Sequence, residues 1–128
     1  MQERDLFEYA VIRVVPKVER EEFLNAGVIL FCARQNFLQA KCQLDDKRIQ
    51  AVFGSGLDLE EIWNNLEAVE RISLGEETSG PIAQLDPASR FRWLTATRST
   101  IVQTSKVHPG FCKNAAETLE RLFRQLVL

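Results

Sequence analysis

Residues 6–15 form the segment that most restricts how this chain can fold. They are rich in aromatic and β-branched side chains, which favour an extended strand. Successive side chains of a strand point to opposite faces, and both faces of this segment are apolar. The two sets are Phe7, Tyr9, Val11 and Val15, and Leu6, Ala10, Ile12 and Val14. The sequence therefore predicts a strand that is buried on both sides and ends at Pro16, because proline cannot donate to a strand ladder.

The chain has the length and composition of one globular domain. It has 128 residues, of which 45% are hydrophobic and 27% are charged. No apolar run approaches the ~20 residues that cross a bilayer, and the first residues lack the pattern of a signal peptide. Cys32, Cys42 and Cys112 form no close pair in the sequence, which favours free thiols and a reducing compartment. We therefore expect a cytoplasmic protein that makes no membrane contact.

Residues 27–44 are predicted to form a β-hairpin around a two-residue turn at Gln35 and Asn36. Pairing the strands about this turn gives one apolar face and one mostly polar face. The apolar face holds Ile29, Phe31, Ala33, Leu38, Ala40 and Cys42, and the polar face holds Cys32, Arg34, Gln39 and Lys41. We therefore expect a hairpin that packs on one side. At the start of the hairpin, Asn25 and Gly27 indicate a bulge or a turn that changes the direction of the strand.

Capping residues and apolar stripes predict four helices. The first spans residues 45–53 and ends at Gly54, and the second begins at Asp58. The third begins at Asp86 and Pro87 and reaches about Leu94, and the fourth is capped by Asn114. The stripe of the second helix is Leu59, Ile62, Trp63, Leu66, Val69 and Ile72, and that of the fourth is Leu119, Leu122, Phe123 and Leu126.

The remaining segments complete the expected fold. Residues 74–84 are predicted to be a loop, residues 99–105 a strand, and Pro109 with Gly110 a turn. Together these elements predict an α+β fold in a single compact domain. An antiparallel sheet of about four strands is covered by the helices that begin at Asp58 and Asn114.

Charge is distributed unevenly, although the net charge is only −2. Residues 55–89 contain eight acids and one base, whereas residues 90–113 contain five bases, the only histidine and no acid. This asymmetry predicts one negative and one positive face. Two solvated surfaces without a function are equally compatible with it.

The basic stretch contains the leading candidate for a ligand-binding site. If residues 99–105 are extended, Ser99, Gln103 and Ser105 share one side of the strand. Hydroxyl and guanidinium groups can together bind an oxyanion. The candidate residues are Arg98, Ser99, Thr100, Gln103, Ser105, Lys106 and His108, with Glu22 and Asn25 as distant polar groups that could contact them. The alternative is a strand whose outer face is hydrogen-bonded and whose basic ends lie in solvent.

Arg90 and Arg92 alternate with Phe91 and Trp93, a pattern that nucleic-acid-binding proteins use for phosphate contact and base stacking. On a helix, the same spacing places Phe91 in the core and the arginines in solvent. Because the domain is not basic overall, nucleic acid is the less favoured partner. The spacings of zinc, phosphate-loop and dinucleotide motifs do not occur, so we expect no metal and no cofactor.

Several segments of the chain match the signatures of a known family. They are FEYAVIR at residues 7–13, EFLNAGVILF at 22–31, RFRWL at 90–94, RSTIVQ at 98–103, Val107 with His108, and Gly110. On these segments the chain resembles an uncharacterised bacterial family, domain of unknown function 3037. The resemblance covers nearly the whole chain, and residues 51–84 are its least distinctive part. It implies no activity, cofactor or catalytic residue.

Two functions remain open from the sequence. The first is a non-enzymatic binding or adaptor protein that recognises an acidic partner or a phosphate-bearing ligand through the basic stretch. The second is a small enzyme that uses His108 as acid and base and Arg98 to hold an anionic substrate. The first is favoured, because no acid or nucleophile with a defined base accompanies the histidine in the sequence.

Overall fold

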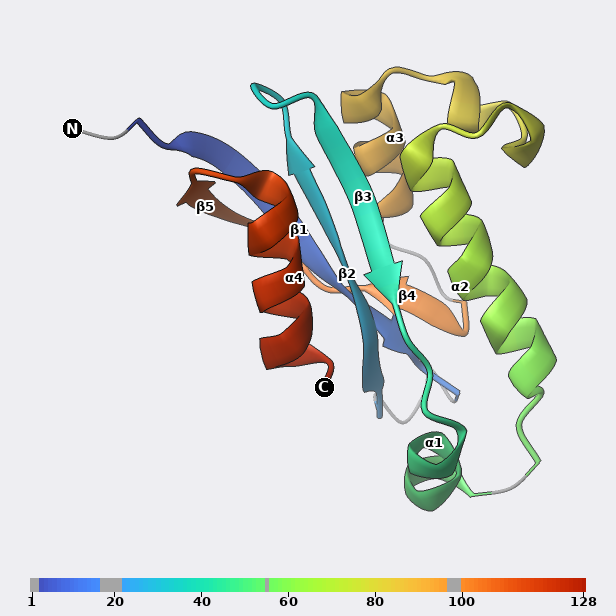
Figure 1. Cartoon of the computed structure of the whole chain (residues 1–128). Helices are drawn as coiled ribbons and strands as arrows, with labels where there is room; N and C mark the ends of the chain where they lie inside the picture. Colours follow the sequence, from blue (N-terminus) through green and yellow to red (C-terminus); the bar gives the residue numbers. More distant parts are fainter. Residues whose placement is uncertain (1–2, 17–21, 55, 97–99) are drawn as a thin grey trace.

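An antiparallel sheet of five strands forms the centre of the molecule (Figure 1). The computed structural model describes residues 3–16, 22–54, 56–96 and 100–128. The strands are β1 (Asp5–Val14), β2 (Leu24–Cys32), β3 (Phe37–Cys42), β4 (Val102–Thr104) and β5 (His108–Cys112). Their order is β3-β2-β1-β4, and β5 also pairs with β1. The fold is therefore α+β with an antiparallel sheet, as the sequence predicts.

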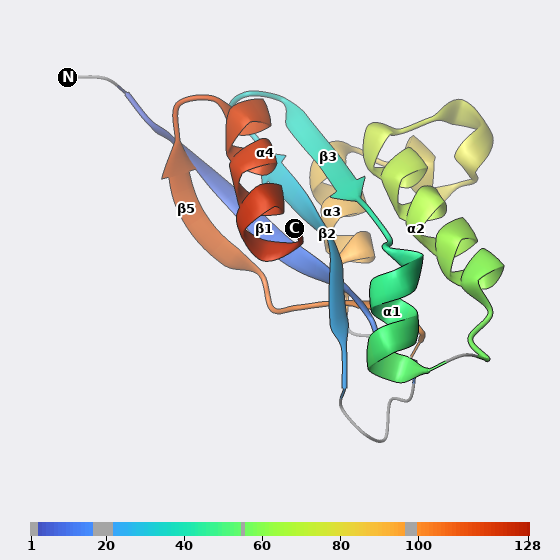
Figure 2. The same cartoon turned by 60° about the horizontal axis from the view of Figure 1, so that its bottom comes forward.

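Helices cover both faces of this sheet. They are α1 (Asp46–Phe53), α2 (Leu59–Leu74), α3 (Pro87–Leu94) and α4 (Ala115–Leu126), and 77–79 and 82–84 form short 3₁₀ turns, η2 and η3. Figures 1 and 2 show α4 on one face and α2 and α3 on the other. The predicted helix starts are confirmed, since Asp45, Asp58, Asp86 and Asn114 each accept a backbone N–H of the following turn.

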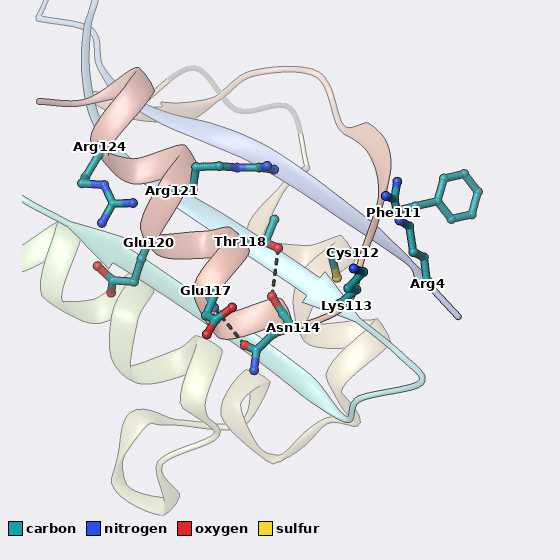
Figure 3. Close-up of a pocket in the computed structure, with 10 residues that line it drawn as sticks. All are labelled: Arg4, Phe111, Cys112, Lys113, Asn114, Glu117, Thr118, Glu120, Arg121 and Arg124. Carbon is teal, nitrogen blue, oxygen red and sulfur yellow. Dashed lines mark hydrogen bonds between the residues drawn. The ribbon is translucent and has the colours of Figure 1, made fainter. Parts of the chain in front are cut away.

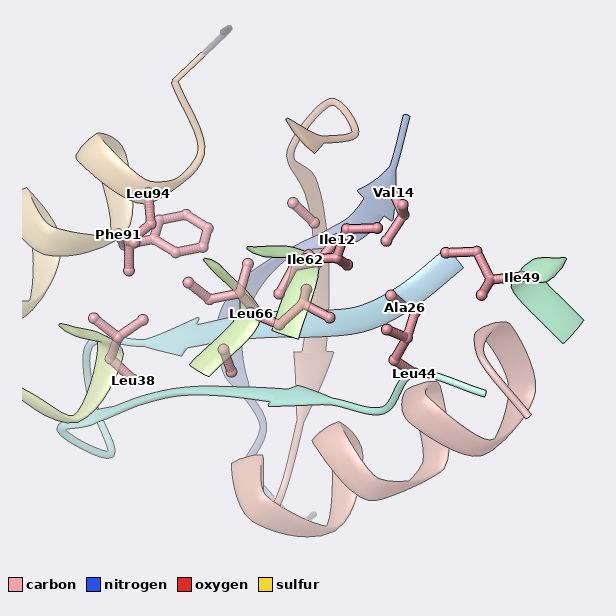
Figure 4. Close-up of a cluster of buried hydrophobic side chains, with 13 residues drawn as sticks. Ile12, Val14, Ala26, Leu38, Leu44, Ile49, Ile62, Leu66, Phe91 and Leu94 are labelled. Atoms are coloured by element: carbon pink, nitrogen blue, oxygen red, sulfur yellow. The ribbon is translucent and has the colours of Figure 1, made fainter. Parts of the chain in front are cut away.

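The central strand β1 pairs with β2 on one side and with β4 and β5 on the other, and both of its faces are apolar. Phe7 lies in the cluster that packs under α4, together with Leu119 and Phe123. Ile12 and Val14 lie in the cluster under α2 and α3, which Figure 4 shows. The prediction of a strand buried on both sides is confirmed.

The expectation that the hairpin packs on one side only is wrong. Val28, Leu30 and Cys32 of β2 are fully buried in the cluster under α4. The amphipathic helix α4 has an apolar stripe that must be buried, and the second face of the hairpin is the surface that covers it. The polar residues Gln39 and Lys41 of β3 hid this contact, because the apolar residues of that face belong to β2 and to Phe37 at the start of β3.

The predicted two-residue turn of the hairpin is also wrong. Cys32 pairs with Phe37, so the turn contains the four residues 33–36. Asn36 adopts a positive φ of 49°, which asparagine tolerates better than most residues. The longer turn leaves these side chains on the same face of the hairpin as predicted, since Phe31 pairs with Leu38 and Ile29 with Ala40.

The predicted bulge before the hairpin is confirmed. Ile12 pairs with Gly27 and Arg13 with Asn25, so Ala26 is an extra residue on β2. A Cβ on Gly27 would lie 2.7 Å from the carbonyl oxygen of Lys41, which explains why glycine occupies this position.

Residues 99–112 differ most from the sequence prediction. Within the described part of the predicted strand 99–105, only Val102–Thr104 forms β4. Pro109 and Gly110 do not form a turn, because they lie inside β5 and pair with Glu8 and Phe7. Proline is tolerated here because β5 lies at the edge of the sheet, where an outward-facing position needs no donor.

The two edges of the sheet are protected in different ways. On β3, the backbone N–H of Ala40 donates to Ser73 Oγ at 3.0 Å, and that of Cys42 donates to Glu70 Oε2 at 3.3 Å. Both acceptors belong to α2, which therefore occupies these two donors of the edge. The opposite edge is formed by β4 and β5, two short strands, of which β5 contains Pro109. Short edge strands and proline both reduce edge-to-edge pairing.

In the described parts of the chain, no helix is both long enough and apolar enough to cross a membrane.

Candidate functional site

The structure distributes the predicted ligand-binding residues over several surfaces. Arg98 and Ser99 lie outside the described residues. Thr100 and Gln103 make local hydrogen bonds: Thr100 Oγ1 donates to the carbonyl of Val102 at 2.6 Å, and Gln103 Nε2 donates to that of Thr100 at 2.8 Å. These bonds stabilise the start of β4.

Ser105 joins β4 and β5 to the central strand. Its backbone N–H donates to the carbonyl of Val11 at 2.8 Å, and its Oγ accepts from the N–H of Val11 at 2.8 Å. The same hydroxyl donates to the carbonyl of Lys106 at 2.9 Å. The buried Ser105 hydroxyl is therefore engaged within the sheet.

Lys106 and His108 follow Ser105 and are both exposed. The His108 ring centroid lies 5.3 Å from that of Tyr9, its partner on β1. Lys106 lies just before β5 and His108 at its first position, along the edge of the sheet.

Arg90 and Asn25 bind backbone carbonyls in other parts of the molecule. Arg90 Nη1 donates to the carbonyl of Leu85 at 2.6 Å, and Asn25 Nδ2 donates to that of Leu126 at 3.0 Å. Arg90 thus supports the junction of α2 and α3, and Asn25 the end of α4. Arg92 and Glu22 are exposed, on α3 and just before β2 respectively.

Cationic side chains gather in a hollow that the sequence did not point to. It has a volume of about 690 Å³ and lies beside α4 and the end of β5 (Figure 3). Its lining residues are Arg4, Phe111, Cys112, Lys113, Asn114, Glu117, Thr118, Glu120, Arg121 and Arg124. We refer to this feature as the basic hollow.

Positive charge exceeds negative charge in the basic hollow. Arg4, Lys113, Arg121 and Arg124 contribute four cations, and none of their cationic groups makes a hydrogen bond or an ion pair within the described chain. The carboxylate of Glu120 is bound by Lys41 Nζ at 2.6 Å and 2.7 Å, so Lys41 offsets its charge. Glu117 is then the one lining carboxylate, among the described residues, without a cationic partner at this distance.

The N-terminus of α4 adds to the positive potential of the hollow. Asn114 Oδ1 accepts the N–H of Glu117 at 3.0 Å, and Thr118 Oγ1 donates to the carbonyl of Asn114 at 2.8 Å, as Figure 3 shows. Aligned peptide dipoles carry a partial positive charge at this end of a helix. Helix and side chains therefore both favour an anionic group.

Gln35, from the hairpin turn, positions this end of α4. Its Nε2 donates to the carbonyl of Lys113 and to Asp5 Oδ2, each at 3.0 Å, and its Oε1 accepts the N–H of Ala115 at 2.8 Å. One side chain thus links the hairpin, β1 and the start of α4, which together frame the basic hollow.

The thiol in the wall of the hollow is poorly suited to nucleophilic chemistry. Burial raises the pKa of Cys112, and the neighbouring Cys32 raises it further. The thiol is therefore neutral near pH 7, whereas the thiolate is the reactive form. Within the described residues, no group of three His, Cys, Asp or Glu side chains could hold a metal ion.

The residues that the sequence did not point to lie far apart along the chain. Arg121 and Arg124 alternate with acids on the polar face of α4, which is the ordinary pattern of a solvated helix. Arg4 joins them because β5 pairs with β1. Lys113 ends the basic stretch, but it was not among the predicted site residues.

No curated protein and no solved structure matches the chain. A family model described as "Protein of unknown function (DUF3037)" matches residues 9–127. The match begins within β1 and ends after α4, and so includes nearly all of the sheet and every helix. The chain therefore belongs to the DUF3037 family.

Proposed function

We propose that this protein is a cytoplasmic binding or adaptor protein that recognises an acidic partner or a phosphate-bearing ligand through the basic hollow. The observation that carries the proposal is that four cations without described partners line one hollow: Arg4, Lys113, Arg121 and Arg124. Guanidinium groups suit carboxylate and phosphate because their fork of donors matches two oxygens. The three free cysteines agree with a reducing compartment.

Binding is favoured over catalysis by the surroundings of the only histidine. The described ring contact of His108 is Tyr9, and His108 does not line the basic hollow. General acid–base catalysis would require a substrate site beside this ring. The cationic site lies instead on α4 and at the end of β5.

The test is calorimetric titration with sodium tripolyphosphate and with hexaglutamate. We expect both probes to bind the native protein and to bind more weakly at high salt. Replacing Arg121 and Arg124 together by alanine should weaken binding by at least about tenfold, because hydrogen bonds to charged groups are worth about 1.5–3 kcal/mol each.

Arg71→Ala is the matched control, because Arg71 is an exposed arginine on the acidic helix α2 and should leave both titrations unchanged. Arg98→Ala tests whether the predicted basic stretch contributes to the same function. Native protein that binds neither probe at low salt would contradict the proposal.

A further inference from the structure

One face of the sheet stays uncovered where β5 pairs with the first half of β1. Leu6, Ala10 and Ile12 point to the side of α2 and α3, because alternate residues of a strand share a face. Ala10 and Ile12 are buried there, whereas Leu6 and its partner Phe111 are 52% and 66% exposed and belong to neither buried cluster. Figures 1 and 2 both show β5 to the side of α2 and α3. The two helices therefore cover only part of this face.

The uncovered part consists of an apolar centre and one carboxylate. Leu6 lies opposite Phe111, and Glu8 lies opposite Pro109, which is also exposed. We refer to these four residues as the open face. Contiguous apolar side chains that remain exposed on a protein surface mark sites of contact with other molecules.

Charges of opposite sign lie at the two ends of the open face. Glu8 comes two residues after Leu6, and Arg4 comes two residues before it. Because the strands are antiparallel, Lys113 lies at the Arg4 end, where the basic hollow adjoins Phe111. Glu8 is partly buried, and within the described residues its carboxylate makes no hydrogen bond or ion pair. The open face thus has an acidic and a basic end at equal distances from its apolar centre, so it is complementary to itself.

We propose that the open face is the contact surface of a homodimer, in which two copies of the chain stack their sheets face to face. The two-fold axis runs along the Leu6–Phe111 pair, across the strands, and reverses the strand direction in the second copy. Each apolar centre then packs on its own counterpart, as in other two-fold interfaces. The basic end of each copy covers the acidic end of the other, so Arg4 meets Glu8 of the partner subunit. This inference does not rest on the proposed function.

The charges favour this arrangement over the other two-fold packing of the same face. An axis along the strands would place Arg4 on Lys113 of the partner subunit and would leave Glu8 without a cation. Like charges in contact destabilise an interface. In the arrangement proposed, the two sheets lie ~10 Å apart, a gap that the long side chains of Arg4 and Glu8 span together.

Pairing of two copies through the edge of the sheet is less favourable than stacking. Val11 directs its N–H and its carbonyl towards Ser105. By the alternation of an antiparallel ladder, the outward-facing backbone groups of β5 are those of Pro109 and Phe111. Pro109 has no N–H to offer, so an added strand would lose a hydrogen bond there. The second copy therefore binds through side chains of the open face.

Sedimentation velocity over a range of protein concentrations tests the proposal. We expect the native protein to change from monomer to dimer as the concentration rises, because a small interface dissociates on dilution. Phe111→Ser removes the apolar centre and should leave a monomer at every concentration. Val52→Ser is the matched control and should dimerise as the native protein does, since Val52 is 55% exposed but lies on α1. Circular dichroism checks that each variant is folded.

Reversal of the two charges tests the orientation of the copies. Arg4→Glu and Glu8→Arg each bring like charges together and should each weaken dimerisation by at least about tenfold. The chain that carries both substitutions has an opposite pair again and should recover the dimerisation of the native protein.

The possible outcomes decide both the surface and the orientation. A native protein that is monomeric at every concentration would overturn the proposal, and so would a native dimer that Phe111→Ser leaves intact. Stronger dimerisation of Arg4→Glu would contradict the proposed orientation, because it would place Arg4 on Lys113 of the partner subunit. Tripolyphosphate binding is measured separately, so the failure of the dimer leaves the anion site standing, and the failure of the anion site leaves the dimer standing.

Discussion

At the scale of single residues, Gly110 shows how a strand position can require the smallest side chain. A Cβ added there would lie 2.5 Å from Cζ of Phe7, which is the residue paired with it on β1. The Phe7 ring covers the glycine and is itself buried under α4. Glycine in this strand is therefore explained by close packing, whereas the sequence suggested a turn.

Gly110→Ala should destabilise the protein by about 1–3 kcal/mol, the usual effect of overpacking a buried contact. Urea denaturation measures the change in the free energy of unfolding. The matched test places the same substitution in a Phe7→Leu background, where the smaller side chain removes the clash and Gly110→Ala should have less effect. The same loss in both backgrounds would mean that the Phe7 ring is not the cause.

Glu70 gives the protein a pH-dependent element at the β3 edge. Burial raises the pKa of its carboxyl, the hydrogen bond from the Cys42 N–H opposes that shift, and repulsion by Glu67 adds to it. A raised folded-state pKa means that protonation stabilises the folded protein. This stability is present below the unfolded pKa of about 4.3 and is lost as pH rises through the folded pKa.

Glu70→Gln should therefore be at least as stable as the native protein at pH 7, because glutamine still accepts from Cys42 and carries no charge. We expect the gain to be less than about 1 kcal/mol, since the partly exposed carboxylate is screened by water. The gain should shrink on acidification to pH 4. Denaturation curves at both pH values provide the measurement, and a gain that increases at pH 4 would show that the native pKa is lowered.

At the scale of elements, the placement of α4 depends on the hairpin turn. The apolar stripe of α4 selects the face of the sheet, but a stripe alone allows the helix to slide. Gln35 removes that freedom by binding the carbonyl of Lys113 and the N–H of Ala115. The turn thus sets where α4 begins, and with it where Arg121 and Arg124 lie.

Gln35→Ala should lower the free energy of unfolding by about 1–3 kcal/mol, since it leaves several partly buried polar groups without a partner. Guanidinium denaturation measures this effect. Arg34→Ala is the control in the same turn, because its side chain is 77% exposed and approaches Asp5 only to 3.9 Å. Equal effects of the two substitutions would indicate a general disturbance of the turn.

At the scale of the whole molecule, local signals in the sequence predicted the elements well. Capping residues and stripes located the helices, and two apolar faces predicted that β1 is buried on both sides. The candidate site was predicted less well. Arg90 Nη2 donates to the carbonyl of Ser73, 17 residues away, and Ser105 Oγ accepts from the N–H of Val11, 94 residues away. A local sequence pattern cannot predict partners at such separations.

The sequence by itself determined the identity and order of most elements, because caps, turns and apolar periodicity act within a few residues. Only the tertiary structure decided that β5 pairs with β1, that α4 covers the second face of β2, and that Arg4 lies in the same hollow as Arg121 and Arg124. These arrangements join positions about a hundred residues apart. They depend on which surfaces fit together when all apolar faces are buried at once. Only the complete fold meets this requirement, so no short segment of the sequence predicts it.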